Sequence, residues 1–335
     1  MTKRVLVTGA CGFIGHALIE DLLTRTDYEI VCLDRLDLSG TLDRVKHVAD
    51  QYPDQKHRIK FVFHDLKAEI NEYTKLQIGD INYIFHLAAG SHVDRSIDFP
   101  REFVMDNVVG TCTILDFARL HCPNLDVFYY FSTDEVFGPA PDQVLYKEWD
   151  RYNSGNPYSA SKAGAEELCL AYSNTYKIPM IITHCMNVFG QRQHKEKYIP
   201  LCIDRIEKGE KIYIHANKEC TKAGSRFYIH TKDVSDAVIF LLEKWNKGEL
   251  PFCDKYNIVG SEEIDNHALA QRISEHINKP LNYEMVDFHS SRPGHDLRYS
   301  LDGEKMDKLG WKPKSLTERL HETIDWYREN TEWLK

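Results

Sequence analysis

The stretch Val5-Leu6-Val7-Thr8-Gly9-Ala10-Cys11-Gly12-Phe13-Ile14-Gly15 decides the fold. Its apolar start predicts a buried strand, and the apolar spacing of Ala17 to Leu23 predicts the helix that follows. The three glycines between them permit a tight turn, a close approach of backbone to pyrophosphate, and close packing of helix on strand. With the N–H groups of the helix N-terminus, Gly9, Gly12, Phe13, Ile14 and Gly15 predict a dinucleotide-binding loop.

The same strand–helix rhythm continues through the first half of the chain. It predicts an α/β fold with a Rossmann-type doubly wound parallel sheet, buried on both faces. After about residue 190 the pattern becomes irregular, so we expect residues 1–190 to form the dinucleotide-binding domain with the catalytic residues. Residues 191–335 are expected to form mainly a smaller C-terminal substrate-binding lobe, with some return of the chain to the first domain. Further strands are expected at 29–33, 60–63, 83–87, 127–131 and 180–183, and further helices at 103–118, 159–172 and 316–327.

The end of the second strand indicates which dinucleotide is bound. Asp34 lies about 20 residues beyond the glycines, where a carboxylate accepts hydrogen bonds from the ribose hydroxyls and repels a 2′-phosphate. NAD is therefore favoured over NADP, although the neighbouring Arg35 weakens that assignment. The ends of the third and fourth strands are expected to meet the same cofactor, through Asp65, Leu66, Leu87, Ala88 and Ala89.

Charge and cysteine content exclude several classes of partner. The net charge of −9 and the pI near 6.0 argue against nucleic acid or an anionic membrane as the main partner. The nine cysteines show no zinc spacing, so we expect no metal site and reduced thiols in a cytoplasmic protein. The apolar run at the N-terminus is too short for a signal peptide or a membrane span.

Two clusters predict acid/base chemistry beside the dinucleotide. Thr133, Asp134 and Glu135 follow an apolar strand, at the sheet edge where ligands bind. Tyr158 and Lys162 share one helix face, so the ammonium can lower the phenol's pKa from about 10 and make it a base. Adjacent carboxylates in a closed site disfavour double ionisation, which provides one acid and one base near neutral pH.

Several segments resemble those of extended short-chain dehydrogenase/reductases, and more narrowly the nucleotide-sugar 4,6-dehydratases typified by the dTDP-glucose enzymes. The resemblance runs from about residue 3 to residue 313 and is carried by the glycine loop and by His86-Leu87-Ala88-Ala89-Gly90-Ser91-His92-Val93-Asp94-Arg95-Ser96, Ser132-Thr133-Asp134-Glu135-Val136-Phe137-Gly138, Pro157-Tyr158-Ser159-Ala160-Ser161-Lys162 and Arg292-Pro293-Gly294-His295-Asp296.

The resemblance implies a redox-neutral lyase that uses NAD. Tyr158 would take the proton of the sugar's 4-hydroxyl while hydride leaves C4, with Lys162 on the nicotinamide ribose. Glu135 would then remove the C5 proton, Asp134 would protonate the departing 6-hydroxyl, and Thr133 would hold the 4-oxygen. Hydride returning to C6 gives a 4-keto-6-deoxy sugar.

The resemblance also implies a nucleotide-diphosphate hexose substrate, dTDP-glucose or UDP-glucose, and a homodimer formed by helices in 103–118 and 159–176. Arginine forks suit a diphosphate. Three features depart from the dTDP-glucose enzymes: Gly90 replaces a glutamate, Phe137 replaces a tyrosine, and 208–224 is longer. The implied substrate contacts are Ser91, Thr133, Asn187, Lys197, Arg226, Asn257, Arg292 and His295.

Three other functions share parts of this pattern. A nucleotide-sugar 4-epimerase would use Tyr158 and Lys162 but would leave Asp134 and Glu135 unexplained. A nucleotide-diphosphate uronate decarboxylase usually has serine at the position of Asp134. A non-catalytic dinucleotide sensor typically lacks the Tyr/Lys pair, which is present here.

Overall fold

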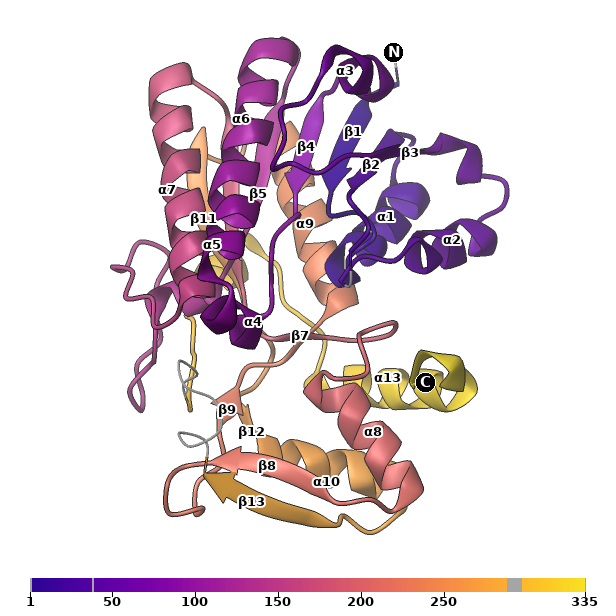
Figure 1. The fold of residues 1–335 in the computed structure, drawn as a ribbon, viewed down its shortest axis with the longest axis vertical. Helices are drawn as coiled ribbons and strands as arrows, with labels where there is room; N and C mark the ends of the chain where they lie inside the picture. The colour runs from indigo at the N-terminus through magenta and orange to yellow at the C-terminus, as the bar shows by residue number, and fades with distance from the viewer. Residues whose placement is uncertain (1, 38, 288–296, 335) are drawn as a thin grey trace.

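The computed structural model describes residues 2–37, 39–287 and 297–334 (Figure 1). Its centre is a seven-stranded sheet in the order β11-β6-β5-β4-β1-β2-β3, in which every neighbouring pair is parallel. The strands are β1 (Arg4–Thr8), β2 (Glu29–Asp34), β3 (Ile59–Phe63), β4 (Tyr83–His86), β5 (Val127–Thr133), β6 (Met180–Cys185) and β11 (Cys253–Ile258). The predicted doubly wound sheet is confirmed, and it has one strand, β11, that the sequence did not predict.

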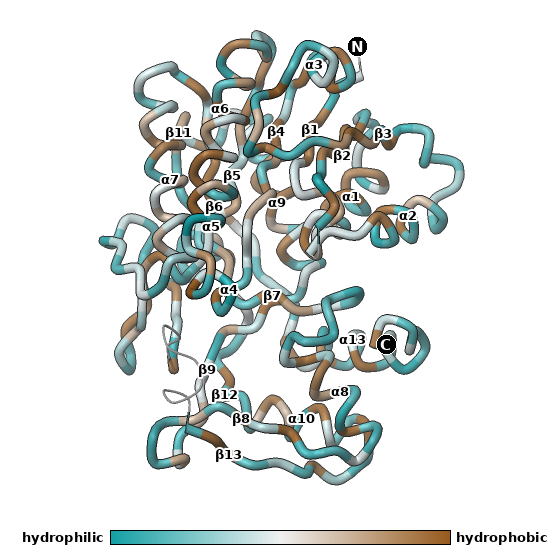
Figure 2. Tube along the Cα trace, in the orientation of Figure 1, coloured by the Kyte–Doolittle hydropathy of each residue, from teal (hydrophilic) through white to brown (hydrophobic). Residues whose placement is uncertain are grey.

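Helices cover both faces of this sheet, because successive strand residues point to opposite sides. Val5 and Val7 pack into a core with Leu18 of α1 (Phe13–Arg25) and with α9 (Thr231–Asn246). Leu6, between them, packs into a second core with Ile114 of α6 (Gly110–His121) and with α7 (Pro157–Tyr176). Figure 2 shows hydrophobic residues along the central strands. No helix within the described ranges is both long and apolar enough to cross a membrane.

The helix predicted at 103–118 is interrupted. The chain forms α4 (Val93–Asp98), the short helix α5 (Pro100–Phe103), a π-helical turn η2 (Val104–Val109) and then α6. Asn107 in the π turn is buried and accepts a hydrogen bond from Gly90 N at 2.7 Å. It donates to Gly90 O at 3.1 Å and to Ser161 Oγ at 2.8 Å. The π turn therefore ties the loop after β4 to α7, and such turns are frequent at functional sites.

A smaller lobe lies beyond the carboxyl ends of the sheet strands (Figure 1). Its elements are α8 (Tyr198–Lys208), β8 (Ile212–Ala216), β9 (Ser225–Arg226), β12 (Ile264–Asp265), α10 (Asn266–Ile277), β13 (Tyr283–Asp287) and α13 (Leu316–Glu329). The lobe has its own core, built from Ile203 of α8, Leu269 of α10 and Leu320 of α13.

The chain crosses between the two parts more than once after residue 190. Helix α9 packs on α1 and β11 completes the sheet, so both return to the first domain. The remaining elements are α2 (Leu42–Gln51), η1 (Lys56–Arg58), α3 (Glu72–Ile78), η3 (Asp134–Phe137), β7 (Val188–Phe189), β10 (Ile229–His230), α12 (Glu304–Leu309) and η4 (Thr331–Leu334).

Candidate active site

The loop between β1 and α1 has no room for a side chain at Gly9 or at Gly15. Gly9 has φ +68°, and a Cβ there would lie 2.7 Å from Ala88 N and 2.8 Å from Ala88 Cα. A Cβ at Gly15 would overlap the carbonyl oxygen of Gly9. Gly12 is the N-cap of α1 and offers no side-chain cap, so the first N–H groups of the helix are left for a ligand. This cradle fits the pyrophosphate of a dinucleotide, for which Phe13 and Ile14 provide the first turn of the helix.

Asp34 is held in a fixed orientation beside this loop. Its carboxylate accepts hydrogen bonds from Cys11 N and Leu36 N, each at 2.9 Å. Burial raises its pKa, which those two N–H donors oppose. The next strand ends bring Asp65, which is partly exposed, and Leu66, which is buried in the second core. Leu87, Ala88 and Ala89 follow β4 and are partly buried.

Thr133, Asp134 and Glu135 lie where β5 turns into the 3₁₀ segment η3. Thr133 Oγ1 donates to Asp134 Oδ1 at 3.0 Å, while Asp134 Oδ2 is buried without a hydrogen-bond partner among the described residues. Burial raises the pKa of Asp134 to about 6. Burial, and next the charge of Asp134, raise the pKa of Glu135 to about 7. Two adjacent carboxyl groups therefore titrate near neutrality, as an acid/base pair requires.

Asn156 links this pair to the helix that carries the tyrosine, a role that the sequence analysis missed. Its Oδ1 accepts from Ser159 N at 2.8 Å and its N–H donates to Ser159 Oγ, which forms a capping box at the start of α7. Its Nδ2 donates to Glu135 Oε2 at 3.1 Å. One side chain thus starts α7 and orients Glu135. An asparagine before Pro157 is a helix-start signal that could have identified it.

Tyr158 and Lys162 lie on one face of α7, but the expected effect of the ammonium on the phenol is wrong for this structure. Lys162 Nζ donates to Phe131 O at 2.6 Å and lies 4.3 Å from the centroid of the Tyr130 ring. Burial lowers the pKa of Lys162 to about 8. Burial, and next the charges of Glu135 and Asp134, raise the pKa of Tyr158, whereas a hydrogen bond with Thr133 lowers it.

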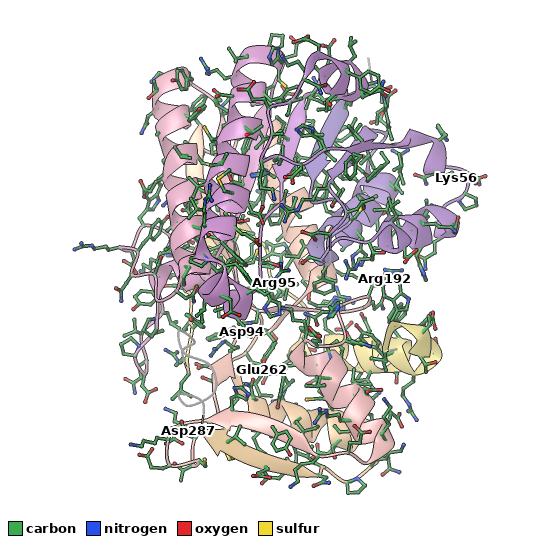
Figure 3. The ribbon with its side chains drawn as sticks, in the orientation of Figure 1. Lys56, Asp94, Arg95, Arg192, Glu262 and Asp287 are labelled. Atoms are coloured by element: carbon green, nitrogen blue, oxygen red, sulfur yellow. The ribbon has the colours of Figure 1, made fainter. Side chains whose placement is uncertain are left out.

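The lobe brings two predicted cations to the carboxylates. The charge of Arg226, on β9, opposes the rise in pKa that burial causes at both Asp134 and Glu135. The charge of Lys197 opposes the rise at Glu135. Arg226 Nη1 donates to Leu297 O at 2.6 Å, which fixes the guanidinium. In Figure 3, Asp94 of α4 and Glu262 of the lobe lie on opposite sides of the region between the two parts.

Four other predicted substrate contacts lie on loops or outside the described residues. Ser91 and Asn187 are exposed, in the segments after β4 and β6. Arg292 and His295 fall within 288–296, outside the residues that the structure describes.

The prediction that Asn257 contacts the substrate is wrong, because its side chain is fully buried in β11. Nδ2 donates to Tyr146 O and Asp302 O, each at 3.0 Å, and Oδ1 lies 3.0 Å from His184 Nδ1. These contacts use the hydrogen-bonding capacity of the amide inside the fold, so Asn257 is not placed to contact a substrate.

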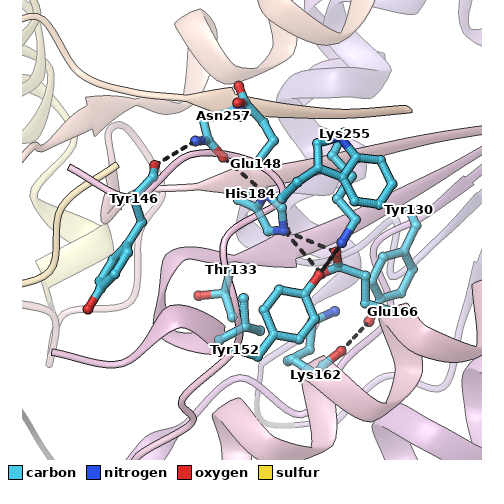
Figure 4. A network of polar contacts seen from close by, with 12 residues as sticks. Tyr130, Thr133, Tyr146, Glu148, Tyr152, Lys162, Glu166, His184, Lys255 and Asn257 are labelled. Atoms are coloured by element: carbon cyan, nitrogen blue, oxygen red, sulfur yellow. Dashed lines mark hydrogen bonds and ion pairs between the residues drawn. The ribbon is translucent and has the colours of Figure 1, made fainter. Parts of the chain in front are cut away.

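The same network of buried polar residues accounts for the polar residues of strand β11 (Figure 4). It also accounts for the burial of Phe137. Glu166 of α7 accepts from His184 Nε2 at 3.1 Å and pairs with Lys255 Nζ at 3.0 Å. The ring of Phe137 packs edge-on against that of His184, with centroids 4.8 Å apart. Phe137 is therefore a core residue beneath the turn that carries Thr133, Asp134 and Glu135.

The parallel sheet with a dinucleotide loop after β1, and with Tyr158 and Lys162 on a helix beside the end of β5, defines an extended short-chain dehydrogenase/reductase. Within that class, the chain belongs to the GDP-mannose 4,6 dehydratase family, which it matches over residues 6–324.

Individual relatives narrow the comparison. The chain is 33% identical to dTDP-glucose 4,6-dehydratase 1 of Escherichia coli, over 99% of this chain and 94% of that protein. The dTDP-glucose 4,6-dehydratase DesIV of Streptomyces venezuelae, solved with NAD bound, has a TM-score of 0.86 and 33% identity, with 99% of each chain covered. The UDP-glucose 4-epimerase of Thermus thermophilus, in complex with NAD, has a TM-score of 0.85 but 26% identity, over 97% of this chain and 99% of that one.

Proposed function

We propose that the protein is an NAD-dependent nucleotide-sugar 4,6-dehydratase, a hydro-lyase that converts a nucleotide-diphosphate glucose to the 4-keto-6-deoxy sugar. The observation that carries the proposal is the adjacent pair Asp134, which is buried, and Glu135, which is partly buried, with pKa values raised to about 6 and about 7, beside Tyr158. A 4-epimerase needs one acid/base group at C4, so this pair would have no role in it. A dehydratase needs such a second proton transfer, across C5 and C6.

NAD, when bound on the Gly9–Gly15 loop and Asp34, would accept the hydride from C4 and return it to C6. The chain's own residues move the protons. Tyr158 removes the proton from the 4-hydroxyl. Burial raises the pKa of its phenol, and the hydrogen bond with Thr133 works in the opposite direction. The hydroxyl of Thr133 also holds the 4-oxygen.

The resulting 4-ketone acidifies the C5 proton, because the carbanion is stabilised as an enolate. Glu135, oriented by Asn156, takes that proton, and Asp134 in its protonated form gives one to the departing 6-hydroxyl. When hydride adds to C6, protonated Glu135 returns a proton to C5, which completes the 4-keto-6-deoxy sugar. Burial raises the pKa of Asp134 to about 6, so a fraction of this carboxyl stays protonated near neutral pH and serves as the acid.

The preferred substrate is dTDP-glucose, with UDP-glucose as the second candidate. The support is the identity with the E. coli and S. venezuelae dTDP-glucose enzymes over nearly the whole chain. The described residues proposed to contact the sugar nucleotide, besides Thr133, are Ser91, Asn187, Lys197 and Arg226. Arg292 and His295 complete the proposed set by sequence.

The test is mass spectrometry of the products after separate incubation with dTDP-glucose, UDP-glucose, GDP-mannose and UDP-N-acetylglucosamine, without added reductant. Loss of one water from dTDP-glucose, with no net reduced cofactor, is the expected result. An unchanged mass with inverted C4, or no turnover of any substrate, would replace the proposal with an epimerase or a dinucleotide sensor.

We also propose a homodimer, in the cytoplasm. Three large apolar side chains are exposed on η2, α6 and α7: Val104 (47%), Leu120 (59%) and Tyr176 (47%). Exposed apolar side chains on neighbouring helices are typical of a surface that a second subunit covers. All nine cysteines are free thiols, which suits a reducing compartment. Light scattering after size exclusion tests the dimer, and fractionation of the source cells tests the compartment.

A further inference from the structure

Arg35, directly after Asp34, is enclosed by carboxylates. Its Nη2 donates to Asp37 Oδ2 at 2.7 Å and to Asp106 Oδ2 at 2.9 Å, and its Nε donates to Asp37 Oδ2 at 3.0 Å. Its Nη1 also contacts Asp106 and lies 3.7 Å from Asp65 Oδ1. The Asp106 side chain is only 11% exposed, so this pairing is partly shielded from water.

This pairing resolves a conflict in the sequence. An acid at the end of β2 favours NAD, whereas an arginine nearby accommodates the 2′-phosphate of NADP. Here the two signals stand side by side as Asp34 and Arg35. Because Arg35 already donates to two carboxylates, its fork is not available to a phosphate unless one of them is displaced.

The surrounding charge disfavours such a displacement. The ends of β2 and β3 and the π turn bring three carboxylates together, and two cations, Arg35 and Lys67, face them. Three negative and two positive charges leave this cluster with a net charge of −1. The carboxylates are Asp37, Asp65 and Asp106.

The glycine at position 90 and the π turn make room for this arrangement. A Cβ on Gly90 would lie 3.2 Å from Asp106 Oδ2 and 3.2 Å from the Phe103 ring. A larger side chain at this position would therefore press on the carboxylate that holds Arg35. The π turn that presents Asp106 also fixes Asn107 on Gly90, so the loop and the carboxylate are held together.

We propose that Asp37 and Asp106 are specificity-determining residues that exclude NADP by sequestering Arg35. This inference rests on the proposed function, in that it assumes that the dinucleotide of this site is NAD. It assigns the discrimination to three residues acting together: Asp34 meets the ribose, and the two further aspartates remove the cation that a 2′-phosphate would use.

The experiment measures dissociation constants of NAD and NADP by calorimetry, on protein freed of co-purified nucleotide. Asp34→Ser removes the carboxylate on the ribose but leaves Arg35 sequestered. Asp34→Ser/Asp37→Asn/Asp106→Asn releases Arg35 with little change in volume. Adding Arg35→Ala to that triple variant removes the released cation, and circular dichroism of each variant confirms folding.

The triple variant is expected to bind NADP at least about tenfold more tightly, relative to NAD, than Asp34→Ser does, because a free guanidinium binds phosphate bidentately. Arg35→Ala is expected to abolish this gain. Equal NADP-to-NAD ratios in the single and triple variants, or a gain that survives Arg35→Ala, would overturn the inference alone. Failure of the unmodified protein to bind NAD would instead overturn the proposed function, and this inference with it.

Discussion

Replacement of Asp134 by asparagine should separate the two proton transfers of the reaction. The side chain is 5% exposed, and asparagine preserves its size and its contact with Thr133. It cannot protonate the 6-hydroxyl, so water elimination should fall by about 10²–10⁴-fold, the usual contribution of a general acid. Oxidation at C4 should persist, because Tyr158 and Lys162 are untouched.

The same variant should shift the pH dependence of proton removal at C5. The charge of Asp134 is the second cause of the raised pKa of Glu135, after burial. A neutral asparagine removes that repulsion, so the pKa of Glu135 should fall below about 7 and the base should stay ionised to lower pH. The effect should be seen above pH 6, where Asp134 with its pKa of about 6 would otherwise carry charge.

The assay is deuterium incorporation at C5 of recovered sugar nucleotide, in buffered D₂O from pH 5 to 8. The acidic limb should move to lower pH in Asp134→Asn. Asp142→Asn is the matched control, because its carboxylate is an exposed partner of Lys222 and should leave the limb in place. Unchanged water elimination in Asp134→Asn, or a limb that stays or moves to higher pH, would refute the assigned roles.

Two further predictions concern the cofactor loop and the buried network. Gly9→Ala should weaken NAD binding at least about tenfold, since the added methyl meets Ala88, whereas Gly248→Ala, with φ +70° and open space around it, should not; calorimetric titration of both variants decides this. Glu166→Gln should lower the free energy of unfolding, measured with urea, by about 3–5 kcal/mol, because it leaves Lys255 in the core without its carboxylate partner. Glu318→Gln, in an exposed pair, should change the midpoint little, and equal midpoints for both would contradict this account.

The sequence predicts the first six strands well because each contains an apolar run. Five of these runs are buried in the sheet, and the sixth, in the edge strand β3, is partly exposed. It does not predict β11, since Asp254, Lys255 and Asn257 interrupt the apolar pattern of that strand. Lys255 is buried only because Glu166, 89 positions away along the chain, neutralises it. Such long-range compensation is invisible to local patterns.

The candidate site shows the same division. The glycine loop, Asp34 and the carboxylate pair could be found from spacing and strand ends, because each depends on local chain geometry. The pKa of Tyr158 could not, because the burial of its ring and the charges of Glu135 and Asp134 come from tertiary packing. Asn257 was assigned to the substrate by resemblance, whereas the structure uses its amide to join β11 to neighbouring segments.

The central claim is that hydride leaves C4 and returns to C6 of the same sugar, with water lost between. Incubation with dTDP-glucose that carries deuterium at C4, followed by NMR of the product, tests it most directly. The account predicts a product lighter by one water, with the deuterium at C6. Deuterium found at C4 of an epimer, or lost together with net formation of reduced cofactor, would contradict it.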